Sequence, residues 1–407
     1  MVPEAGEMPD RTVFTVAFGE QLATMTLPME TPLPDAEVID LLALTLVPGL
    51  GPRLTQALLD RFGSASAARR ANANDLEGIP HIGSKLSRAF VEALRNADGQ
   101  AEVERASQHG VSVLPYTSPD YPTRLKELPD APHVLYVRGS IIPSDHMAVA
   151  IVGSRKCTSY GQRMATRIAA GLARAGYTIV SGLALGIDGS AHRGALEAKG
   201  RTIAVLAGGL SSIYPPDHVQ LAEEVAGSGA LITETPMMMQ PQRGMFHTRN
   251  RLISGLAQAV VIVEANDRSG ALITARHAAE QGRDVFAIPA NVDSHFSAGS
   301  LRLLRDGAKL IRDVDDLLED LKGLRTTPSN ARRTVPARSV APPPEATPPL
   351  ALDPDQQRVW DFLTEPRHVD EITRTMELAS GAVSTLLLKM EMKKAIRRAP
   401  GGIFERR

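Results

Sequence analysis

The 407-residue sequence contains a single cysteine, Cys157, and therefore cannot form a disulfide within the chain, which agrees with a reducing compartment. No hydrophobic run reaches the roughly 18 residues that a membrane helix needs. The longest candidate, 252–263, is interrupted by Gly255 and Gln258. The first apolar run follows acidic residues and not the basic segment that begins a signal peptide. We therefore expect a cytoplasmic protein with no membrane span.

The chain also lacks an excess of positive charge, since 45 lysines and arginines face 46 aspartates and glutamates. A protein that coats nucleic acid through charge alone is usually more basic, so a nucleic-acid site has to come from local clustering of cations. Three enzyme signatures are missing as well: the Gly-x-Ser-x-Gly elbow, the P-loop and the His-Glu-x-x-His metal motif. These absences argue against the enzyme classes that use them.

Changes in composition divide the chain into five predicted segments, as its length suggests. Two are rich in proline and lack hydrophobic periodicity: a disordered tail at 1–35 and a linker at 322–352. Three carry the patterns of folded domains: a helical domain at 36–100, an α/β domain with its leading connector at 101–321, and a small domain at 353–407.

In the helical domain the pattern predicts helix pairs joined by short turns of apolar residues and glycine. The turns read Pro-Gly-Leu-Gly at 48–51 and Ile-Pro-His-Ile-Gly at 79–83. Such turns are typical of a tandem helix-hairpin-helix, whose glycines leave N–H groups free to bind a phosphate. Because only Arg53 and Lys85 lie near the turns, a plain helical packing module is the alternative.

Short strands at 111–114 and 134–137 precede a regular alternation of apolar runs and helical segments. This order predicts an α/β fold with a Rossmann-like parallel sheet and helices on both faces. The strands expected in this core are 148–152, 178–181, 202–206, 230–233, 259–264, 284–288 and 309–311.

The first core strand runs into Gly153-Ser154-Arg155, where a dinucleotide-binding protein carries Gly-x-Gly-x-x-Gly. The second glycine of that fingerprint lets the backbone touch a pyrophosphate, and Arg155 takes its place here. The second strand ends in Ser181-Gly182, without the acid that binds a ribose. We therefore expect no NAD, FAD or other cofactor. The pattern predicts a phosphate-binding helix N-terminus supplemented by the Arg155 guanidinium, with a surface salt bridge as the alternative.

Two later turns also follow core strands. Asp188 and His192 are four residues apart, and we expect Asp188 to be the N-cap of the helix that follows the second strand. Metal binding or acid–base chemistry by this pair is the alternative, and no metal site is predicted. After the fifth strand, Ser269 and Gly270 open a helix whose N–H groups are expected to face the same crevice.

Residues 235–263 contain Arg243, Arg249 and Arg251 but no acidic residue, and Phe246 lies among the arginines. A single nucleic-acid strand needs cations for its phosphates and a flat ring for a base, and stacking on such a ring contributes about 1–3 kcal/mol. Core packing is the alternative for Phe246. Acids from elsewhere in the fold could still neutralise the arginines.

The small last domain is predicted to be a winged helix. Its helices are expected at 355–363, 368–375 and 380–392, and a two-stranded hairpin at 395–398 and 403–406. Basic residues gather toward its end, which favours contact with duplex DNA or with a partner protein. A solvated basic edge is the alternative.

Five motifs occur in an order that resembles the DNA-processing protein A family, also called DprA or Smf. They are Gly153-Ser154-Arg155, Ser-Gly-x-Ala-x-Gly-Ile-Asp at 181–188, Tyr214-Pro215-Pro216, Arg-Asn-Arg-x-Ile-Ser-Gly-Leu at 249–256, and Ser-Gly-x-Leu-Ile-Thr-Ala at 269–275. The flanks agree with the SAM-like domain and the winged helix that many members carry.

The resemblance implies a protein that binds and protects incoming single-stranded DNA, forms a homodimer through its Rossmann-like domain and loads RecA during natural transformation. Family members use the arginine of the Gly-Ser-Arg motif, and a basic residue three positions before an aromatic one. The predicted nucleic-acid-binding set is Gly153, Ser154, Arg155, Arg243, Phe246, Arg249, Asn250, Arg251, Ser269 and Gly270, with no catalytic residue.

Two other functions stay open on the same core. A phosphoribohydrolase-like enzyme needs a Pro-Gly-Gly-x-Gly-Thr turn followed by a glutamate. Here the turn reads Arg268-Ser269-Gly270-Ala271, and the next acid is Glu280. The missing carboxylate argues against hydrolysis, so we expect no enzyme. A sensor of a small nucleotide is the remaining alternative.

Overall fold

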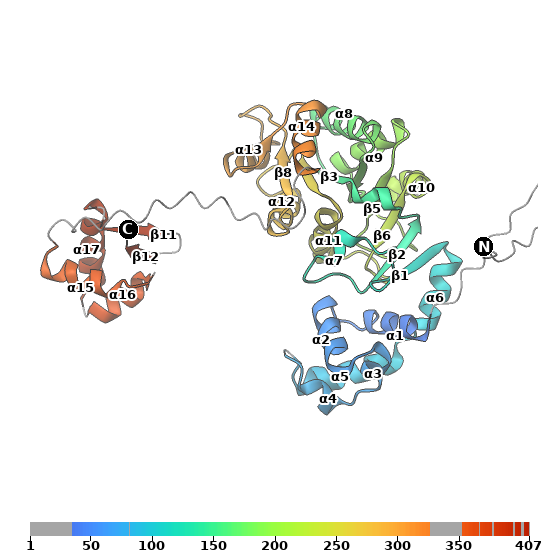
Figure 1. Ribbon diagram of the computed structural model, residues 1–407, viewed down its shortest axis with the longest axis horizontal. Helices are drawn as coiled ribbons and strands as arrows, with labels where there is room; N and C mark the ends of the chain where they lie inside the picture. Colours follow the sequence, from blue (N-terminus) through green and yellow to red (C-terminus); the bar gives the residue numbers. More distant parts are fainter. Residues whose placement is uncertain are drawn as a thin grey trace, which may run out of the picture. The chain divides into compact units, whose positions relative to one another are not determined.

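The computed structural model describes residues 35–80, 82–325, 352–365, 367–376, 378–393, 395–399 and 403–406. The chain divides into two compact units, Met1–Leu324 and Arg325–Arg407, and each is considered by itself (Figure 1). Nearly all of the predicted tail (1–35) and linker (322–352) falls outside the described residues. The last helix of the first unit runs to Arg325, so the first four residues assigned to the linker are helical.

The centre of the first unit is a nine-stranded sheet in the order β1-β2-β6-β5-β4-β3-β7-β8-β9. Apart from β1 and β2, the seven strands of this sheet are mutually parallel, which confirms the predicted α/β core. The strands are β1 Val111–Pro115, β2 Val134–Gly139, β3 Ala148–Val152, β4 Thr178–Ser181, β5 Thr202–Val205, β6 Ala230–Thr233, β7 Ala259–Ile262, β8 Asp284–Ala287 and β9 Lys309–Leu310.

Helices cover both faces of this sheet (Figure 1). Every residue of β3 is buried, with Val149 and Ile151 packed on one side and Ala150 and Val152 on the other, as expected for a parallel sheet covered twice. One face carries α8 Ser159–Arg174, α9 Ile187–Glu197, α10 Val219–Ser228 and α14 Val314–Arg325. The other face carries α7 Thr123–Lys126, α11 Arg243–Leu256, α12 Ala271–Glu280 and α13 Ala298–Arg305.

The strand order places a topological switch between β3 and β7. From β3 the chain builds β4, β5 and β6 toward one edge, and then returns through α11 to β7 on the other side of β3. The connections leave the carboxyl ends of β3 and β7 in opposite directions, and this divergence opens a crevice at that edge. The position of the crevice therefore follows from the order of the strands.

The segment expected to be a connector extends the sheet. β1 pairs antiparallel with β2, and β2 pairs antiparallel with β6, so both strands belong to the sheet itself. Ahead of them lie α1 Ala36–Thr45, α2 Pro52–Phe62, α3 Ala65–Arg70, α4 Ala73–Glu77, α5 Ser84–Asn96 and α6 Gly99–Gln108. Because α6 crosses residue 100, the helical region continues up to β1. A boundary at 100 between two domains remains a prediction.

A buried carboxylate joins the helical region to the sheet. Glu102 of α6 is 1 % exposed, and its Oε1 accepts hydrogen bonds from the Tyr136 hydroxyl at 3.1 Å and from the Met237 N–H at 2.7 Å. Its Oε2 pairs with Arg105 at 2.5 Å. One side chain therefore connects α6, β2 and the loop that leads to α11.

The second unit is a winged helix, as predicted. It contains α15 Pro354–Phe362, α16 Val369–Met376 and α17 Ser380–Met392 around a small core that includes Ile372, Leu387 and Phe404. The hairpin of β11 Ile396–Ala399 and β12 Ile403–Arg406 is joined by a third strand, β10 Arg367–His368, which the sequence pattern did not reveal. Among the described residues of both units, no helix is long and apolar enough to span a membrane.

We predict that Glu102→Ala destabilises the first unit by about 2–4 kcal/mol, because two buried donors lose their acceptor. Denaturant unfolding followed by a probe of the first unit measures the change. Glu104→Ala removes an exposed carboxylate from the same helix and is the matched control, with an expected effect within roughly 0.5 kcal/mol. Equal stability of the two variants would contradict the role assigned to Glu102.

Candidate nucleic-acid interface

A cavity of about 720 Å³, called the pocket below, opens at the carboxyl ends of β3 and β7. Its walls are the turn after β3, one face of α11, and the loop that connects β7 to α12. The lining residues are Val152, Gly153, Ser154, Arg155, Lys156, Ala184, Asp188, Arg243, Phe246, His247, Arg249, Asn250, Ile253, Asn266, Arg268, Ser269, Gly270, Ala271 and Thr274. Nine of the ten residues predicted for the site are among them; Arg251 is not.

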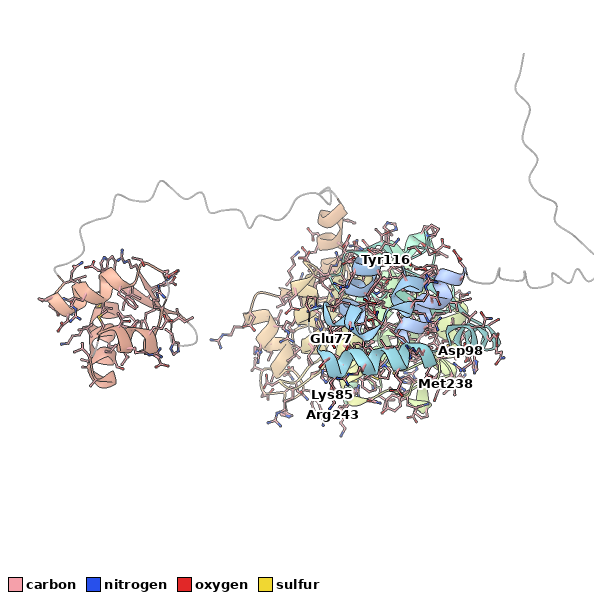
Figure 2. The ribbon with its side chains drawn as sticks, turned by 90° about the horizontal axis from the view of Figure 1, so that it is seen from below. Glu77, Lys85, Asp98, Tyr116, Met238 and Arg243 are labelled. Atoms are coloured by element: carbon pink, nitrogen blue, oxygen red, sulfur yellow. The ribbon has the colours of Figure 1, made fainter. Side chains whose placement is uncertain are left out.

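One helix contributes most of the predicted side chains. Arg243, Phe246 and Asn250 are spaced by three and four residues along α11, so they share one face of the helix. That face lines the pocket. Arg243, at the first position of the helix, is exposed and lies at the surface of the first unit (Figure 2). The spacing therefore places a cation at the mouth of the pocket and a ring one turn further in.

A loop and a helix that are distant in sequence bring a cation and an aromatic ring together. The Arg155 guanidinium carbon lies 4.8 Å from the centroid of the Phe246 ring, within the range of a cation–π contact. The Tyr214 ring lies 5.7 Å from Phe246 at an interplanar angle of 58°, and 48 % of Tyr214 is exposed. Phe246 is therefore not core filling, since it sits between an arginine and a second, exposed ring.

The exposed cations around the pocket have no carboxylate partners. Arg155, Lys156, Arg243 and Arg268 are all exposed, and within the part of the chain that the structure describes none of them forms an ion pair. Arg155 is thus not held in the surface salt bridge that was its alternative. Four unpaired cations around one cavity create a positive potential that attracts an anionic chain.

Arg249 is buried beneath the pocket. It is 5 % exposed, and its Nη1 donates to the carbonyl oxygens of Gly182 and Val205, the former at 2.8 Å. Burial lowers the pKa of Arg249 to about 10, so the side chain remains protonated at neutral pH. A Cβ on Gly182 would lie 2.7 Å from the guanidinium, which explains why a glycine follows β4. Arg249 adds fixed positive charge to the wall of the pocket.

Asp188 does not cap α9 as predicted. The N-cap position is Gly186, and Asp188, in the first turn, accepts a 3.1 Å hydrogen bond from the Gly182 N–H. Burial raises the pKa of Asp188, an effect that the nearby Arg249 opposes. His192 is also buried, and its Nδ1 lies 2.7 Å from the Thr202 hydroxyl. Burial lowers its pKa to about 3, so this imidazole is neutral at physiological pH.

The helix after β3 does not offer its N-terminus to a ligand, contrary to the prediction. α8 begins at Ser159, and the buried Glu264 carboxylate accepts hydrogen bonds from the Thr158 N–H at 2.7 Å and the Thr158 hydroxyl at 2.9 Å. This carboxylate follows β7 by two residues and places a negative charge beside the start of α8, which disfavours a phosphate there. The start of α12 is different, because Ser269 and Gly270 line the pocket and the space beside Gly270 is open.

Arg251 points away from the pocket. It follows Asn250 by one residue, which turns it by about 100° around α11. The side chain is buried and forms an ion pair with Glu234. It also pairs with Asp130, whose carboxylate lies 3.6 Å from the guanidinium. We therefore remove Arg251 from the proposed site and assign it a structural role.

Three residues that the sequence reasoning missed belong to the same region: Lys156, Arg268 and Tyr214. Lys156 and Arg268 are adjacent to predicted positions and line the pocket. Tyr214 was noticed only as part of a motif, and its contact with Phe246 spans two segments that the sequence does not connect. Among the described residues, no cluster of His, Cys, Asp and Glu side chains has the arrangement of a metal site.

Comparison with known proteins identifies the family. Residues 112–322 match the family described as DNA recombination-mediator protein A, and residues 342–402 match the DprA winged helix domain. Protein Smf of Synechocystis sp. is 35 % identical over 394 residues, which covers 90 % of this chain and 98 % of that protein. The chain belongs to the DprA/Smf family. The Rossmann-like core and the winged helix are thus both family features.

Other DprA/Smf proteins extend this result. Protein Smf of Escherichia coli is 37 % identical over 302 residues, covering 74 % of this chain and 78 % of its own. The X-ray structure of DprA from Streptococcus pneumoniae matches with a TM-score of 0.61 at 32 % identity, and covers 70 % of this chain and 97 % of that one. The first unit is therefore built as in a solved DprA.

We predict that Arg251→Ala destabilises the first unit by about 3–5 kcal/mol, because Glu234 loses its buried partner. Burial already raises the pKa of Glu234, and Arg251 opposes that rise. Without Arg251 the folded protein holds the Glu234 proton more tightly than the unfolded chain, so the loss should be smaller at pH 5 than at pH 8. Denaturant unfolding at both pH values measures this.

Arg276→Ala is the control, since Arg276 is exposed and forms an ion pair with Glu280, one turn along α12. We expect its stability to match the wild type at both pH values. A loss of stability in Arg251→Ala that is independent of pH would show that Glu234 is not the group left unpaired.

Proposed function

We propose that this chain binds single-stranded DNA in the pocket and acts by holding the strand, without catalysing a reaction. The observation that carries the proposal is the contact of Arg155 with Phe246 at the switch point, surrounded by cations that have no acidic partners. Guanidinium and ammonium groups suit phosphates, and an accessible ring suits a base. Belonging to a family described as DNA recombination mediators supports the same ligand.

Each group of pocket residues has a distinct role in this binding mode. The cations would contact successive phosphates, Lys156 as a point charge and the arginines through their planar guanidinium groups: Arg155, Arg243 and Arg268. Phe246 would stack a base, with Tyr214 offering a second ring beside it. The proposed set also includes the following residues, which shape the wall and floor: Gly153, Ser154, Arg249, Asn250, Ser269 and Gly270.

Two buried carboxylates near the pocket support a binding function over hydrolysis. Glu264 is engaged by Thr158 at the start of α8, and Asp188 is buried against the Gly182 N–H. A general base must reach a water beside the substrate, and both of these buried carboxylates already accept hydrogen bonds from the protein. A phosphoribohydrolase-like reaction or sensing of a free nucleotide is the alternative, since a cavity of this size could also admit a mononucleotide.

We further propose that the chain protects incoming single strands, forms a homodimer through the sheet-containing unit, and delivers the strand to RecA in transformation and recombination. Membership of the DprA/Smf family supports this proposal. The winged helix would contact duplex DNA or a protein. Dimer formation and binding of RecA can be tested separately from the pocket, because both can be measured with pocket variants that no longer bind DNA.

We predict that Arg155→Ala and Arg243→Ala each weaken binding of oligo-dT and reduce the slope of log K against log salt by about 0.7 for every phosphate that is no longer bound. Gel shifts or fluorescence anisotropy at several salt concentrations measure both quantities. Arg302→Ala, on α13 and paired with Asp306, is the control and should leave both unchanged.

Competition with a mononucleotide separates the alternatives in the same assay. If the pocket grips a strand, a mononucleotide competes poorly and is recovered intact after incubation. Strong competition, or release of the free base, would support the sensor or the hydrolase. Unchanged affinity in both arginine variants would remove the pocket from the proposal.

We predict that Phe246→Ala costs about 1–3 kcal/mol of single-strand binding while the salt slope stays nearly constant, because stacking releases no counterion. Phe246→Trp keeps a flat ring and should retain most of the affinity. Titrations of both variants at two salt concentrations provide the test. A reduced slope in Phe246→Ala would mean that the substitution has displaced Arg155 and has not merely removed a stacking platform.

A further inference from the structure

A second basic surface lies beside the pocket, and the proposed function does not yet use it. Between α8 and α9 runs a hollow of about 490 Å³, called the arginine groove below. Its lining residues are Gln162, Arg163, Thr166, Arg167, Gly186, Ser190, Arg193 and Glu197. Arg163, Arg167 and Arg193 are exposed, and among the described residues none of the three forms an ion pair.

The groove exists because α8 and α9 pack unusually closely. A Cβ on Gly194 would lie 2.4 Å from the Thr166 carbonyl oxygen, so only glycine permits this approach. The Thr166 hydroxyl also donates to the Ser190 carbonyl oxygen at 3.3 Å. Small side chains therefore form the floor, while the long arginines rise from both helices as walls. Arg163 and Arg167 stand one turn apart, roughly 6 Å along the axis of α8.

The arginine groove and the pocket share a wall. Gly186, which lines the groove, has a φ of +79°, and a Cβ there would lie 2.4 Å from the Ser154 carbonyl oxygen and 2.7 Å from that of Arg155. The Ile187 N–H donates to the same Ser154 oxygen at 3.2 Å. The turn that carries Arg155 therefore separates the two hollows by one layer of backbone, with Ala184 and Asp188 on the pocket side.

We propose that the arginine groove binds the sugar–phosphate backbone of the single strand where it leaves the pocket past Arg155. The inference rests on the proposed function and adds a second binding segment to it. Charge favours this occupant, because three cations without an ion-pair partner among the described residues line a groove that adjoins the basic pocket. No aromatic side chain occurs among the described residues that line the groove, so contacts there are to phosphates and leave the bases exposed.

Acidic residues mark the limits of this track. Glu197, at the last position of α9, lines the groove and would oppose a phosphate next to it. Beyond Arg167 the surface carries Asp313 and Asp315, and Asp313 accepts hydrogen bonds from the Asp315 and Asp316 N–H groups at the start of α14. The groove is therefore short, and we assign it a few nucleotides beyond those in the pocket.

The test compares oligo-dT of about 4 and about 16 nucleotides, the ends of the usual range for single-strand sites. The triple variant Arg163→Gln, Arg167→Gln, Arg193→Gln should bind the long strand roughly 10- to 100-fold more weakly at 0.1 M salt, with a slope reduced by about 2. The short strand, which fits in the pocket, should bind as it does to the wild type. Arg276→Gln, Arg302→Gln, Arg312→Gln removes the same charge from exposed sites and is the control.

A single substitution that is expected to increase affinity makes the test independent of folding defects, since a misfolded variant would not bind more tightly. Glu197→Gln removes the opposing carboxylate and should tighten the long strand by roughly two- to fivefold without changing the short one. Three outcomes would contradict the proposed role of the arginine groove. They are an equal loss of affinity for both lengths in the triple variant, a matching loss in the control, and a loss of duplex binding alone. If Arg155→Ala leaves short-strand binding intact while the triple variant still weakens the long strand, the proposed pocket fails and the groove stands.

Discussion

The burial of Arg249 is the constraint on which the rest of the site depends. Its guanidinium is fixed to main-chain oxygens at the ends of β4 and β5, so α11 cannot rotate about its own axis. Because α11 is held in this orientation, Arg243, Phe246 and Asn250 must face the pocket and Arg251 must face away from it. A small residue after β4 is part of the same constraint, since a side chain on Gly182 would displace the guanidinium. Arg249 therefore both places a positive charge below the pocket and fixes the orientation of α11.

Local charge is separated within a chain whose net charge is only −1. Two buried acids near the pocket are directed elsewhere: Glu264 to the start of α8 and Asp188 to the backbone after β4. Among the residues that the structure describes, the cations at the pocket mouth keep no such partners. In the proposed binding mode an anionic strand would therefore meet unpaired charge without the protein being basic overall, and non-specific attraction to other polyanions would stay limited.

Much of this could be predicted from the sequence, and the reasons are physical. Short apolar runs in alternation with helical segments define a parallel sheet, and all carboxyl ends of such a sheet meet at one edge. Arg155 and the residues of α11 could therefore be placed together from their positions after β3 and before β7. The winged helix followed from its own helix and hairpin signals.

What the sequence did not reveal depends on contacts between distant segments. Glu264 reaches Thr158 across 106 positions, and no local pattern indicates that it closes the start of α8. The pairing of β2 with β6, and the meeting of Tyr214 with Phe246, depend on tertiary packing in the same way. Arg251 is a different case. Its position one residue after Asn250 already put it on another face of α11, so helical geometry alone could have excluded it.

The closure of α8 also explains why this core suits a polymer better than a coenzyme. In a dinucleotide-binding protein, main-chain amides at the helix start grip one compact pyrophosphate from a fixed direction. Here Glu264 accepts hydrogen bonds from the Thr158 N–H and hydroxyl beside the start of α8, and in the proposed binding mode recognition passes to long side chains around an open mouth. Arginine side chains can follow a flexible backbone, whereas main-chain amides cannot move. The same substitution of guanidinium for amide continues along α8, where Arg163 and Arg167 extend the charged line away from the pocket. A strand held in the proposed way would be bound by its backbone, and most of its bases would remain available for pairing.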